Sequence, residues 1–558
     1  MVYFNIVAFV MIFFIVVYSS RKERHPLFQG MELELILDDF EKAKPIVFML
    51  ICAFALFSRL YEFPNLPIGI NQDEAMAAVN AKALLTYGED ISGLGFPVYL
   101  PAWNTAQMNI LESLLMIPAI GIFGMNSLSV RLPMLLASLA SIAVIYDFTK
   151  RMFGGSVAVL CLFLVSINPW HIMLSRWGLE SNLFPACVLC AFYFLYRGTT
   201  EKKPVFLYIS MLFWAASMYA YGIAYFAVPF ILIVSAVYLL KNKVIKVKTV
   251  VICFFIYFTI SLPIFLMMAV NYFILPSFNL GFLTIPYFPH SVRMNDLIFG
   301  SSDIIEQARN NFIHIIINIL QFPDVPWNLM PEFGTLYIFS LPLAIYGYAK
   351  MKGGGASDFI VRLWLAASLL TGMIINSAGT NQINILFFPL IILCTIGLNN
   401  ILSNNKTNNR SISLVGILPI AAYLVAFLVF LFAYQEGLPG YSAYRFYEGF
   451  GESVVAADQS GSPRVYVTSW TQNESSANVS EILTLYHCDI DSRYYRGETT
   501  IEGVPPYSER YLYTSFTGTP GYDSSAVYVI NIWGDGYLFP QNEFSIIRFG
   551  DYGVAKRR

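Results

Sequence analysis

The chain has 558 residues, of which 57% are hydrophobic and only 13% are charged. Soluble domains carry about a quarter charged residues, so this deficit predicts a protein that lies largely in a lipid bilayer, where each charge is costly. The formal net charge of −2 excludes a nucleic-acid-binding protein that acts by neutralising phosphates. Six of the seven cysteines lie in apolar segments. Cys187 and Cys190 have no further metal ligands nearby, so we interpret them as packing residues rather than a zinc site.

Twelve segments are apolar over about 20 residues, the length that a helix needs to cross a bilayer. They lie near residues 2–20, 45–62, 128–149, 154–170, 181–197, 204–220, 222–240, 249–271, 334–350, 359–377, 382–399 and 411–434. The predicted fold class is therefore an all-α polytopic membrane protein with about 12 transmembrane helices. The first segment lacks the charged start and the cleavage site of a signal peptide, so we expect it to remain as a helix.

Most lysines and arginines before residue 435 fall in connections on one face of the predicted bundle. Because such residues concentrate on the cytoplasmic side, both termini are expected on the extracytoplasmic side. This orientation places three polar regions outside, namely the loops 63–127 and 272–333 and the tail 435–558. Connections as long as 272–333 are usually functional, so this loop is a candidate lid.

The tail 435–558 alternates strand-like runs with helix-like stretches. The strand-like runs are Arg464–Ser469, Ala526–Ile532 and Phe544–Phe549, and the helix-like stretches are Tyr441–Asp458 and Ala477–Tyr486. This pattern predicts a small extracytoplasmic α/β domain. The predicted organisation is an extra transmembrane helix with a cytoplasmic linker at 1–44, a transmembrane core at 45–434, and the α/β domain at 435–558.

The first outer loop opens with the acidic pair Asp73 and Glu74, followed by a helical run to about Tyr87. One interpretation is structural: Asp73 caps a helix at the membrane surface, and Glu74 favours the positive end of its dipole. The other is functional: the carboxylates serve a site at the interface, one as a base and the other holding a ligand or a cation. Further along, residues 106–123 are mostly apolar but contain Gln107, Asn109 and Glu112, which fits a helix that lies along the membrane.

Two arginines lie at the same predicted outer face. Arg131 falls at the outer end of the helix near 128–149, where it either extends to the interface or binds a phosphate. Arg176 and Glu180 are four residues apart in the next outer turn, which predicts an ion pair on one helix face. Such a pair leaves two further polar residues of this turn unexplained, namely His171 and Asn182.

Several short motifs, in order along the chain, resemble those of family 39-type glycosyltransferases of the GT-C superfamily. This family includes protein O-mannosyltransferases and the bacterial transferases that attach aminoarabinose to lipid A. The motifs are Asn71–Ala75, Ser129–Pro133, Asn168–His171 with Ser175, Arg176 and Glu180, Asn328–Gly334, and Asn381–Pro389 with Gly397 and Leu398. The match covers roughly residues 45–400. Where the lipid A enzymes have a lysine after a Pro-Pro pair, this chain has Pro101–Asn104, which sets it apart from them.

The resemblance implies an integral-membrane glycosyltransferase of the cell membrane. It would transfer a sugar from a polyprenyl-phosphate donor to a lipid, glycan or protein acceptor hydroxyl, with inversion, on the extracytoplasmic face. Its partners would be this donor, the acceptor and membrane lipids, but no nucleic acid. No cofactor or metal is expected, although an Asp-Glu pair can hold a divalent cation through its oxygen atoms.

The resemblance also assigns roles to residues of the outer face. Asp73 would be the catalytic base, and Glu74 would orient the acceptor or a cation. Positive charge must lie where negative charge develops on the donor phosphate. The residues that would hold this phosphate are therefore Arg131, Arg176 and His171. The supporting residues would be Glu180, which would fix Arg176, and Asn182.

Other functions remain open from the sequence. A GT-C ligase or polymerase would take its sugar from a lipid diphosphate, and a transporter or flippase would move polyprenyl-linked sugars. Transporters usually bury ionisable residues at mid-membrane, whereas the predicted spans are nearly free of charge and the candidate residues collect at one interface. This difference favours an enzyme. A third alternative is an inactive fold whose C-terminal domain serves in adhesion or assembly.

Overall fold

The computed structural model describes residues 2–20, 37–102, 106–289, 297–300, 303–320, 330, 333–351, 354–376, 378–404, 406–408, 411–412, 414–436, 445–471, 474–516 and 522–558. Some sequence predictions fall outside these residues. They are most of the linker at 21–36, Trp103 and Asn104, part of the candidate lid at 290–296, most of the motif at 328–332, and the start of a predicted helix at 441–444.

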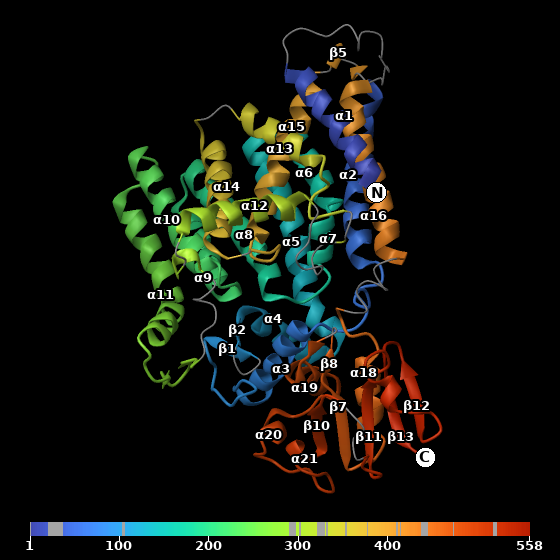
Figure 1. Cartoon of the computed structure of the whole chain (residues 1–558). Coiled ribbons are helices and arrows are strands. Elements are labelled where there is room, and N and C mark those ends of the chain that lie inside the picture. Colours follow the sequence, from blue (N-terminus) through green and yellow to red (C-terminus); the bar gives the residue numbers. More distant parts are fainter. Residues whose placement is uncertain are drawn as a thin grey trace.

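Long helices form the larger part of the molecule and fill the upper half of Figure 1. They are α1 (Val2–Ser20), α2 (Leu37–Leu60), α5 (Ser127–Phe153), α6 (Gly155–Ser166), α8 (Glu180–Thr200), α9 (Pro204–Ala220), α10 (Ala224–Lys241), α11 (Val247–Tyr272), α13 (Ser340–Lys350), α14 (Ala356–Ile374), α15 (Phe387–Asn404) and α16 (Leu414–Glu436). Every predicted apolar segment contains one of these helices, since a helix satisfies its own backbone groups in lipid.

Eight helices of the described part are long and apolar enough to cross a membrane, namely α1, α5, α8, α10, α11, α14, α15 and α16. The other four predicted spans are helices with shorter apolar stretches, and α13 has only 11 residues. The predicted span at 154–170 ends early because Asn168 caps a separate short helix, α7 (Pro169–Leu174), whose first residue is a proline. The chain is therefore a multi-pass, mostly helical membrane protein.

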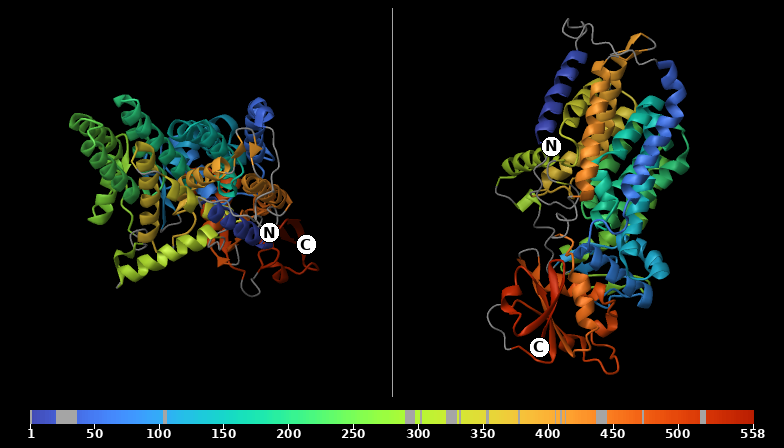
Figure 2. Two further views of the ribbon diagram at one scale, coloured as in Figure 1. Left: turned by 90° about the horizontal axis from the view of Figure 1, so that it is seen from above. Right: turned by 90° about the vertical axis from the view of Figure 1, so that its right-hand side faces the viewer.

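Shorter elements connect the long helices. They are β3 (Phe278–Asn279), β4 (Thr284–Ile285), η3 (Ile298–Gly300), α12 (Ile304–Leu320), η4 (Asn384–Leu386), β5 (Lys406–Asn408) and β6 (Ser411–Ile412). The strands β3 and β4 pair as an antiparallel hairpin directly after α11. Seen from above, α10 and α11 lie at one edge of the bundle, far from the two chain ends (Figure 2).

The first outer loop folds into α3 (Gln72–Tyr87), β1 (Tyr99–Ala102), β2 (Ala106–Asn109) and α4 (Leu111–Phe123). These elements lie between the long helices and the C-terminal domain (Figure 1). The predicted helix at 106–123 is wrong at its start, because Ala106–Asn109 pairs with Tyr99–Ala102 as an antiparallel hairpin. The N–H of Asn109 at the end of this hairpin donates to the Glu180 carboxylate, so α4 begins only at Leu111.

The C-terminal domain is a mixed sheet with helices, which confirms the predicted small α/β domain. Its elements are α18 (Phe450–Asp458), β7 (Arg464–Thr468), β8 (Trp470–Thr471), β9 (Glu474–Ser475), α19 (Ala477–His487), α20 (Ser492–Tyr495), α21 (Tyr507–Arg510), β10 (Tyr511–Thr514), β11 (Ala526–Asn531), η5 (Gly536–Leu538), β12 (Phe544–Phe549) and β13 (Tyr552–Arg557). The five-stranded sheet has the order β10-β7-β11-β13-β12. The strands β10, β7 and β11 are parallel, and β13 runs antiparallel to β11 and β12.

One hydrophobic core joins the C-terminal domain to the first outer loop. Buried apolar side chains of α3 and α4 pack in the same cluster as those of α18, α19 and the sheet, for example Ala78, Leu84, Met116, Val454, Leu483 and Val529. Burying apolar area stabilises by about 25 cal/mol per Å². The two parts therefore form one folded unit rather than a domain on a flexible link.

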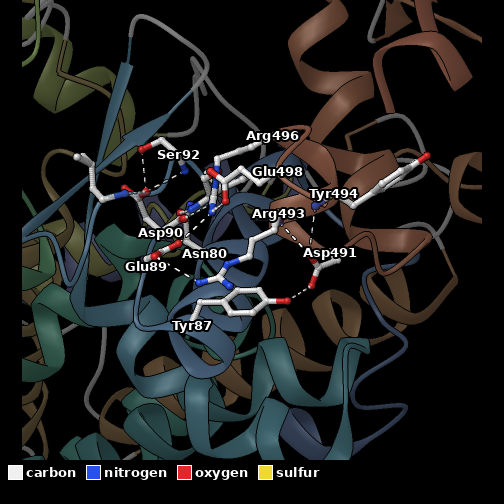
Figure 3. A network of polar contacts seen from close by, with 12 residues as sticks. Asn80, Tyr87, Glu89, Asp90, Ser92, Asp491, Arg493, Tyr494, Arg496 and Glu498 are labelled. Carbon is white, nitrogen blue, oxygen red and sulfur yellow. Dashed lines mark hydrogen bonds and ion pairs between the residues drawn. The ribbon is translucent and has the colours of Figure 1, made fainter. Parts of the chain in front are cut away.

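A polar network borders this core at the end of α3 (Figure 3). The Tyr87 hydroxyl donates to Asp491 Oδ2 at 2.7 Å. Arg496 Nη2 lies 2.9 Å from Glu89 Oε2, so residues 491–496 of the C-terminal domain bond directly to the first outer loop. Lys82 of α3 pairs with Asp489 nearby.

The carboxylate of Asp491 makes this contact sensitive to acid. Burial opposes its ionisation, but the hydrogen bonds from Tyr87 and from two backbone N–H groups outweigh burial and hold the pKa of Asp491 below its usual value. The stabilisation is therefore complete above the ordinary Asp pKa of about 4 and is lost as the pH falls below it. We expect the protection of the last turns of α3 against hydrogen exchange, relative to the intrinsic rate at each pH, to fall in acid, and to fall less in Asp491→Asn protein. An equal fall in both proteins would contradict this role.

Candidate functional site

The helix α3 begins at the acidic pair, and a capping box fixes its start. Asn71 is the N-cap residue: its Oδ1 accepts from the N–H of Asp73 at 2.9 Å, and Glu74 Oε2 accepts from the N–H of Asn71 at 3.0 Å. The interpretation that Asp73 caps the helix is therefore wrong, because Asn71 takes that position. Asp73 is half-buried in the first turn, where the helix dipole favours a carboxylate.

Glu74 is fully buried and forms a two-point ion pair with Arg131 of α5. Arg131 Nε lies 2.9 Å from Oε1, and Nη2 lies 3.0 Å from Oε2. The N–H of Gly178 also donates to Oε1 at 2.9 Å. The remaining N–H groups of Arg131 donate to backbone carbonyls of the turn that precedes α3, those of Pro64, Pro67 and Gly69.

This ion pair holds the turn at 64–69 against α3 and α5. Each oxygen of Glu74 accepts two hydrogen bonds, and the guanidinium of Arg131 makes five. Contact of Glu74 with an acceptor, or of Arg131 with a phosphate, stays a prediction, and it would require these bonds to be exchanged.

Arg176, like Arg131, holds the segment that precedes α3 through hydrogen bonds to its backbone. It is buried, and its N–H groups donate over 2.6–3.2 Å to backbone carbonyls at the end of α2 and beyond, those of Ser58, Arg59, Tyr61 and Leu66. The predicted pairing of Arg176 with Glu180 on one helix face is wrong. The short helix α7 ends at Leu174 and α8 begins at Glu180, so the two residues do not share a helix.

Glu180 bonds instead to the hairpin of the first outer loop. Its Oε2 accepts from the backbone N–H of Asn109 at 2.5 Å and from Asn109 Nδ2 at 3.0 Å. Asn109 Oδ1 in turn accepts from the Tyr225 hydroxyl at 3.0 Å. Glu180 therefore positions β2 against α8 and α10. Asn182 is buried nearby, with Nδ2 at 3.5 Å from the carbonyl oxygen of Trp177.

His171 faces a buried arginine. Its Nδ1 lies 2.8 Å from Arg59 Nη2, and its Nε2 has no hydrogen-bond partner among the described residues. Burial, followed by the charge of Arg59, holds the pKa of His171 well below its usual value. The ring is therefore neutral, with Nδ1 accepting from Arg59 and the proton on Nε2. Arg59, near the end of α2, is itself fully buried.

Glu112 of α4 is a candidate that the sequence did not single out. It is 1% exposed, and neither carboxylate oxygen has a hydrogen-bond partner within the described ranges. Burial, followed by the negative charges of Glu180, Glu74 and Asp73, raises the pKa of Glu112 well above its usual value. A Cβ at Gly178 would come within 2.7 Å of Glu112 Oε1, so this position has no space for a side chain. The only sequence signal was a carboxylate in an otherwise apolar helix.

The structure thus gathers four carboxyl groups, each in a different environment. Glu74 is neutralised by Arg131, Glu180 accepts two hydrogen bonds from Asn109, and Glu112 favours its neutral form. Asp73 is the one of the four that is half-buried rather than buried, so its carboxylate is the most accessible of them. The parts of the chain that the structure describes contain no group of three or more metal-ligating side chains in metal-binding geometry.

The start of the C-terminal domain packs over this site. The ring of Phe446 lies edge-on to Trp177 at 5.4 Å between centroids. The Tyr447 hydroxyl donates to Gln72 Oε1 at 2.7 Å. A Cβ at Gly69 would lie 2.0 Å from the carbonyl oxygen of Phe446, and Gly69 has a φ of 84°, so glycine is required there. The turn before α3 is therefore enclosed between Arg131 and the C-terminal domain.

Comparisons with known proteins agree with this architecture. Residues 114–269 match the family model described as dolichyl-phosphate-mannose-protein mannosyltransferase. No curated protein sequence matches the chain. The fold is similar to that of ArnT from Cupriavidus metallidurans bound to undecaprenyl phosphate, with a TM-score of 0.56 and 12% identity over 93% of this chain and 98% of that chain. It is also similar to the Archaeoglobus fulgidus oligosaccharyltransferase tethered with an acceptor peptide, with a TM-score of 0.50 and 13% identity over 93% and 75%.

These matches confirm the resemblance that the sequence motifs suggested. The chain has the fold of the GT-C membrane glycosyltransferases, and the matched family segment includes Arg131, Arg176 and Glu180. The apo state of the same ArnT matches with a TM-score of 0.52 and 14% identity over 92% of this chain and 98% of that chain.

The ion pair of Glu74 with Arg131 generates a stability prediction. Glu74→Gln leaves the buried Arg131 without its charge partner, and breaking such a pair costs about 3–5 kcal/mol. We expect a clearly lower unfolding temperature in detergent or nanodiscs. Arg464→Gln, which breaks the exposed pair with Asp523, is the control and should change it little. Unchanged unfolding with lost activity would instead give Glu74 a direct chemical role.

The contribution of Glu112 to folding stability is expected to depend on pH in the opposite direction to that of Asp491. A carboxyl group whose pKa is raised by folding costs stability as the pH rises above its unfolded pKa of about 4.3. Glu112→Gln keeps the shape of the neutral acid and removes this cost. We expect the variant to unfold at a higher temperature than the native protein at pH 8, with the difference vanishing towards about pH 4. The same difference at both pH values would show that Glu112 is not held neutral.

Proposed function

We propose that this protein is a glycosyltransferase that transfers a sugar from a polyprenyl-phosphate donor to an acceptor hydroxyl on the extracytoplasmic face of the cell membrane. The observation that carries the proposal is the place of Asp73. Within a GT-C fold, it lies half-buried at the start of α3, between the apolar helices and the C-terminal domain. The similar structures support the choice of ligands, because one holds undecaprenyl phosphate and another an acceptor peptide.

In this mechanism Asp73 acts as the general base. It takes the proton of the acceptor hydroxyl as that oxygen forms its bond to the anomeric carbon of the sugar. The bond between this carbon and the phosphate oxygen breaks on the opposite side, so the configuration at the carbon is inverted. The polyprenyl phosphate leaves as a stable anion, and no general acid is required.

The neighbouring groups hold Asp73 in position. Arg131 neutralises Glu74, and burial favours the neutral form of Glu112, which limits the negative charge beside the base. The capping box holds the first turn of α3, so the base has a fixed place relative to the turn at 64–69.

Phosphate binding needs positive charge near the leaving group. Arg131 and Arg176 already donate to the turn at 58–69, so we propose that both hold this turn rather than contact the phosphate directly. Glu74 balances the charge of Arg131, so the positive potential would come from Arg176. A neutral His171 supplies no charge and can donate only through Nε2.

The positive-inside pattern of the sequence supports an extracytoplasmic site. The first outer loop and the C-terminal domain lie on the same side of the bundle, opposite the lysine-rich connection between α10 and α11. The acceptor is a hydroxyl of a lipid, a glycan or a protein. Comparing monophosphate with diphosphate donors distinguishes the two classes of carrier.

Asp73→Asn tests the function and the base together. Purified protein in nanodiscs is incubated with radiolabelled polyprenyl-phosphate and polyprenyl-diphosphate sugars, and release of the free lipid phosphate is followed. We expect the native protein to turn over a monophosphate donor. Loss of a general base lowers the rate by about 10²–10⁴-fold, and donor binding should persist.

Asp489→Asn is the matched control, because Asp489 is an exposed aspartate on the same side whose carboxylate pairs with Lys82. It should keep native turnover. Turnover that survives Asp73→Asn would move the base to another residue. Binding without turnover of every donor would instead favour a transport or assembly role, and turnover of diphosphate donors alone would favour a ligase or polymerase.

A further inference from the structure

The segment that follows α11 is unusually apolar for a loop between helices. The sequence has no Asp, Glu, Lys or Arg between Lys248 and Arg293. Six large apolar side chains at the end of α11 and in the following hairpin are 46–73% exposed, namely Tyr272, Phe273, Ile274, Leu275, Leu280 and Phe282. Soluble proteins rarely expose a contiguous patch of this kind without a partner. We call residues 272–285 the apolar hairpin.

The backbone of the apolar hairpin satisfies many of its own polar groups. Phe278 pairs with Ile285, and Asn279 pairs with Thr284, in the β3–β4 ladder. Further N–H groups find acceptors inside the segment or in α11, with Phe273 donating to Ala269, Leu275 to Val270, Leu280 to Leu283, Gly281 to Asn279 Oδ1, and Tyr287 to Ser277 Oγ. Irregular backbone can enter an apolar medium only when its polar groups are paired in this way.

The exposed surface of the apolar hairpin continues that of α11. This helix of 26 residues lies at the edge of the bundle and packs mainly against α9 (Figure 2). Its outward face carries exposed aromatic side chains, among them Phe254, Phe255 and Phe258. The lipid that surrounds α11 is therefore the neighbour that the apolar hairpin meets at the end of the helix.

The apolar hairpin is also bonded to the first outer loop. The carbonyl oxygen of Thr284 accepts from the N–H of Val98 at 3.0 Å, and the N–H of Thr284 donates to the carbonyl of Phe96 at 3.1 Å. The Thr284 hydroxyl donates to the carbonyl of Gly95 at 2.6 Å. Residues 95–98 lead directly into β1 and β2, and β2 ends at Asn109, the partner of Glu180.

We propose that the apolar hairpin inserts into the bilayer surface on the side of the C-terminal domain and anchors residues 95–98 of the first outer loop there. Its partner is the lipid leaflet itself, into which interfacial elements bury their apolar face. The anchor would fix the height of β1 and β2 above the membrane. This inference concerns a lipid contact and does not depend on sugar transfer.

A depth measurement tests the insertion. Phe282→Cys is spin-labelled in nanodiscs, and its collisions with oxygen and with a water-soluble nickel chelate are compared by power-saturation EPR. Ile501→Cys is the matched control, because Ile501 is 49% exposed in the connection from α20 to α21, two helices of the C-terminal domain that lie away from the long helices (Figure 1). The signal of the labelled parent chain, with its seven cysteines, is subtracted from both.

We expect the label at 282 to favour oxygen and the label at 501 to favour the nickel chelate. Equal access of the chelate to both positions would overturn the insertion.

A second measurement tests the anchoring. Phe282→Glu places a charge in the leaflet and should expel the apolar hairpin, so the N–H groups of Val98 and Thr284, which join the hairpin to the first outer loop, lose protection in hydrogen exchange. Ile501→Glu should leave them unchanged. Unchanged exchange of these two amides in Phe282→Glu protein, with a spin label at Leu280→Cys of the same protein shown to be expelled, would overturn the anchoring. Both measurements are made without donor or acceptor, so failure of the proposed sugar transfer would not affect them.

Discussion

The buried ion pair between Glu74 and Arg131 joins the parts of the molecule that form the candidate site. It connects α3, α5, the turn at 64–69 and the N–H of Gly178, and Phe446 of the C-terminal domain packs 5.8 Å from the same guanidinium. Removing two charges from water is costly, so such a pair is stable only when further hydrogen bonds satisfy it. Here the backbone of the turn provides them. The position of Asp73 depends on this arrangement, since it is the residue next to Glu74.

Four chemically similar groups acquire separate roles through their surroundings alone. Two glutamates hold structure, one through an arginine and the other through an asparagine. Burial without a hydrogen-bond partner among the described residues favours the neutral form of Glu112. All four lie in the first turn of a helix, but only Asp73 is half-buried rather than buried.

The sequence was sufficient for the architecture but not for the partners of polar residues. Apolar runs predicted the helices because lipid permits few alternatives, and alternation predicted β7, β11 and β12. The Asp73 region was recognisable from its motif. The roles of Arg176 and Glu180 were not, because their partners, Leu66 and Asn109, lie 110 and 71 positions away. Local spacing suggested an ion pair that the break between α7 and α8 prevents.

The shared core of α3 and the C-terminal domain also sets an order for biogenesis. The side chain of Asn71 bonds to the carbonyl of Arg445, which lies 374 positions later. At a synthesis rate of about 5–20 residues per second, the start of α3 waits on the order of half a minute for this partner. During that time the apolar face of α3 is uncovered. The start of α3 therefore gains its full set of contacts only after residue 445 has been translated, and an interrupted chain would lack the cover of the C-terminal domain.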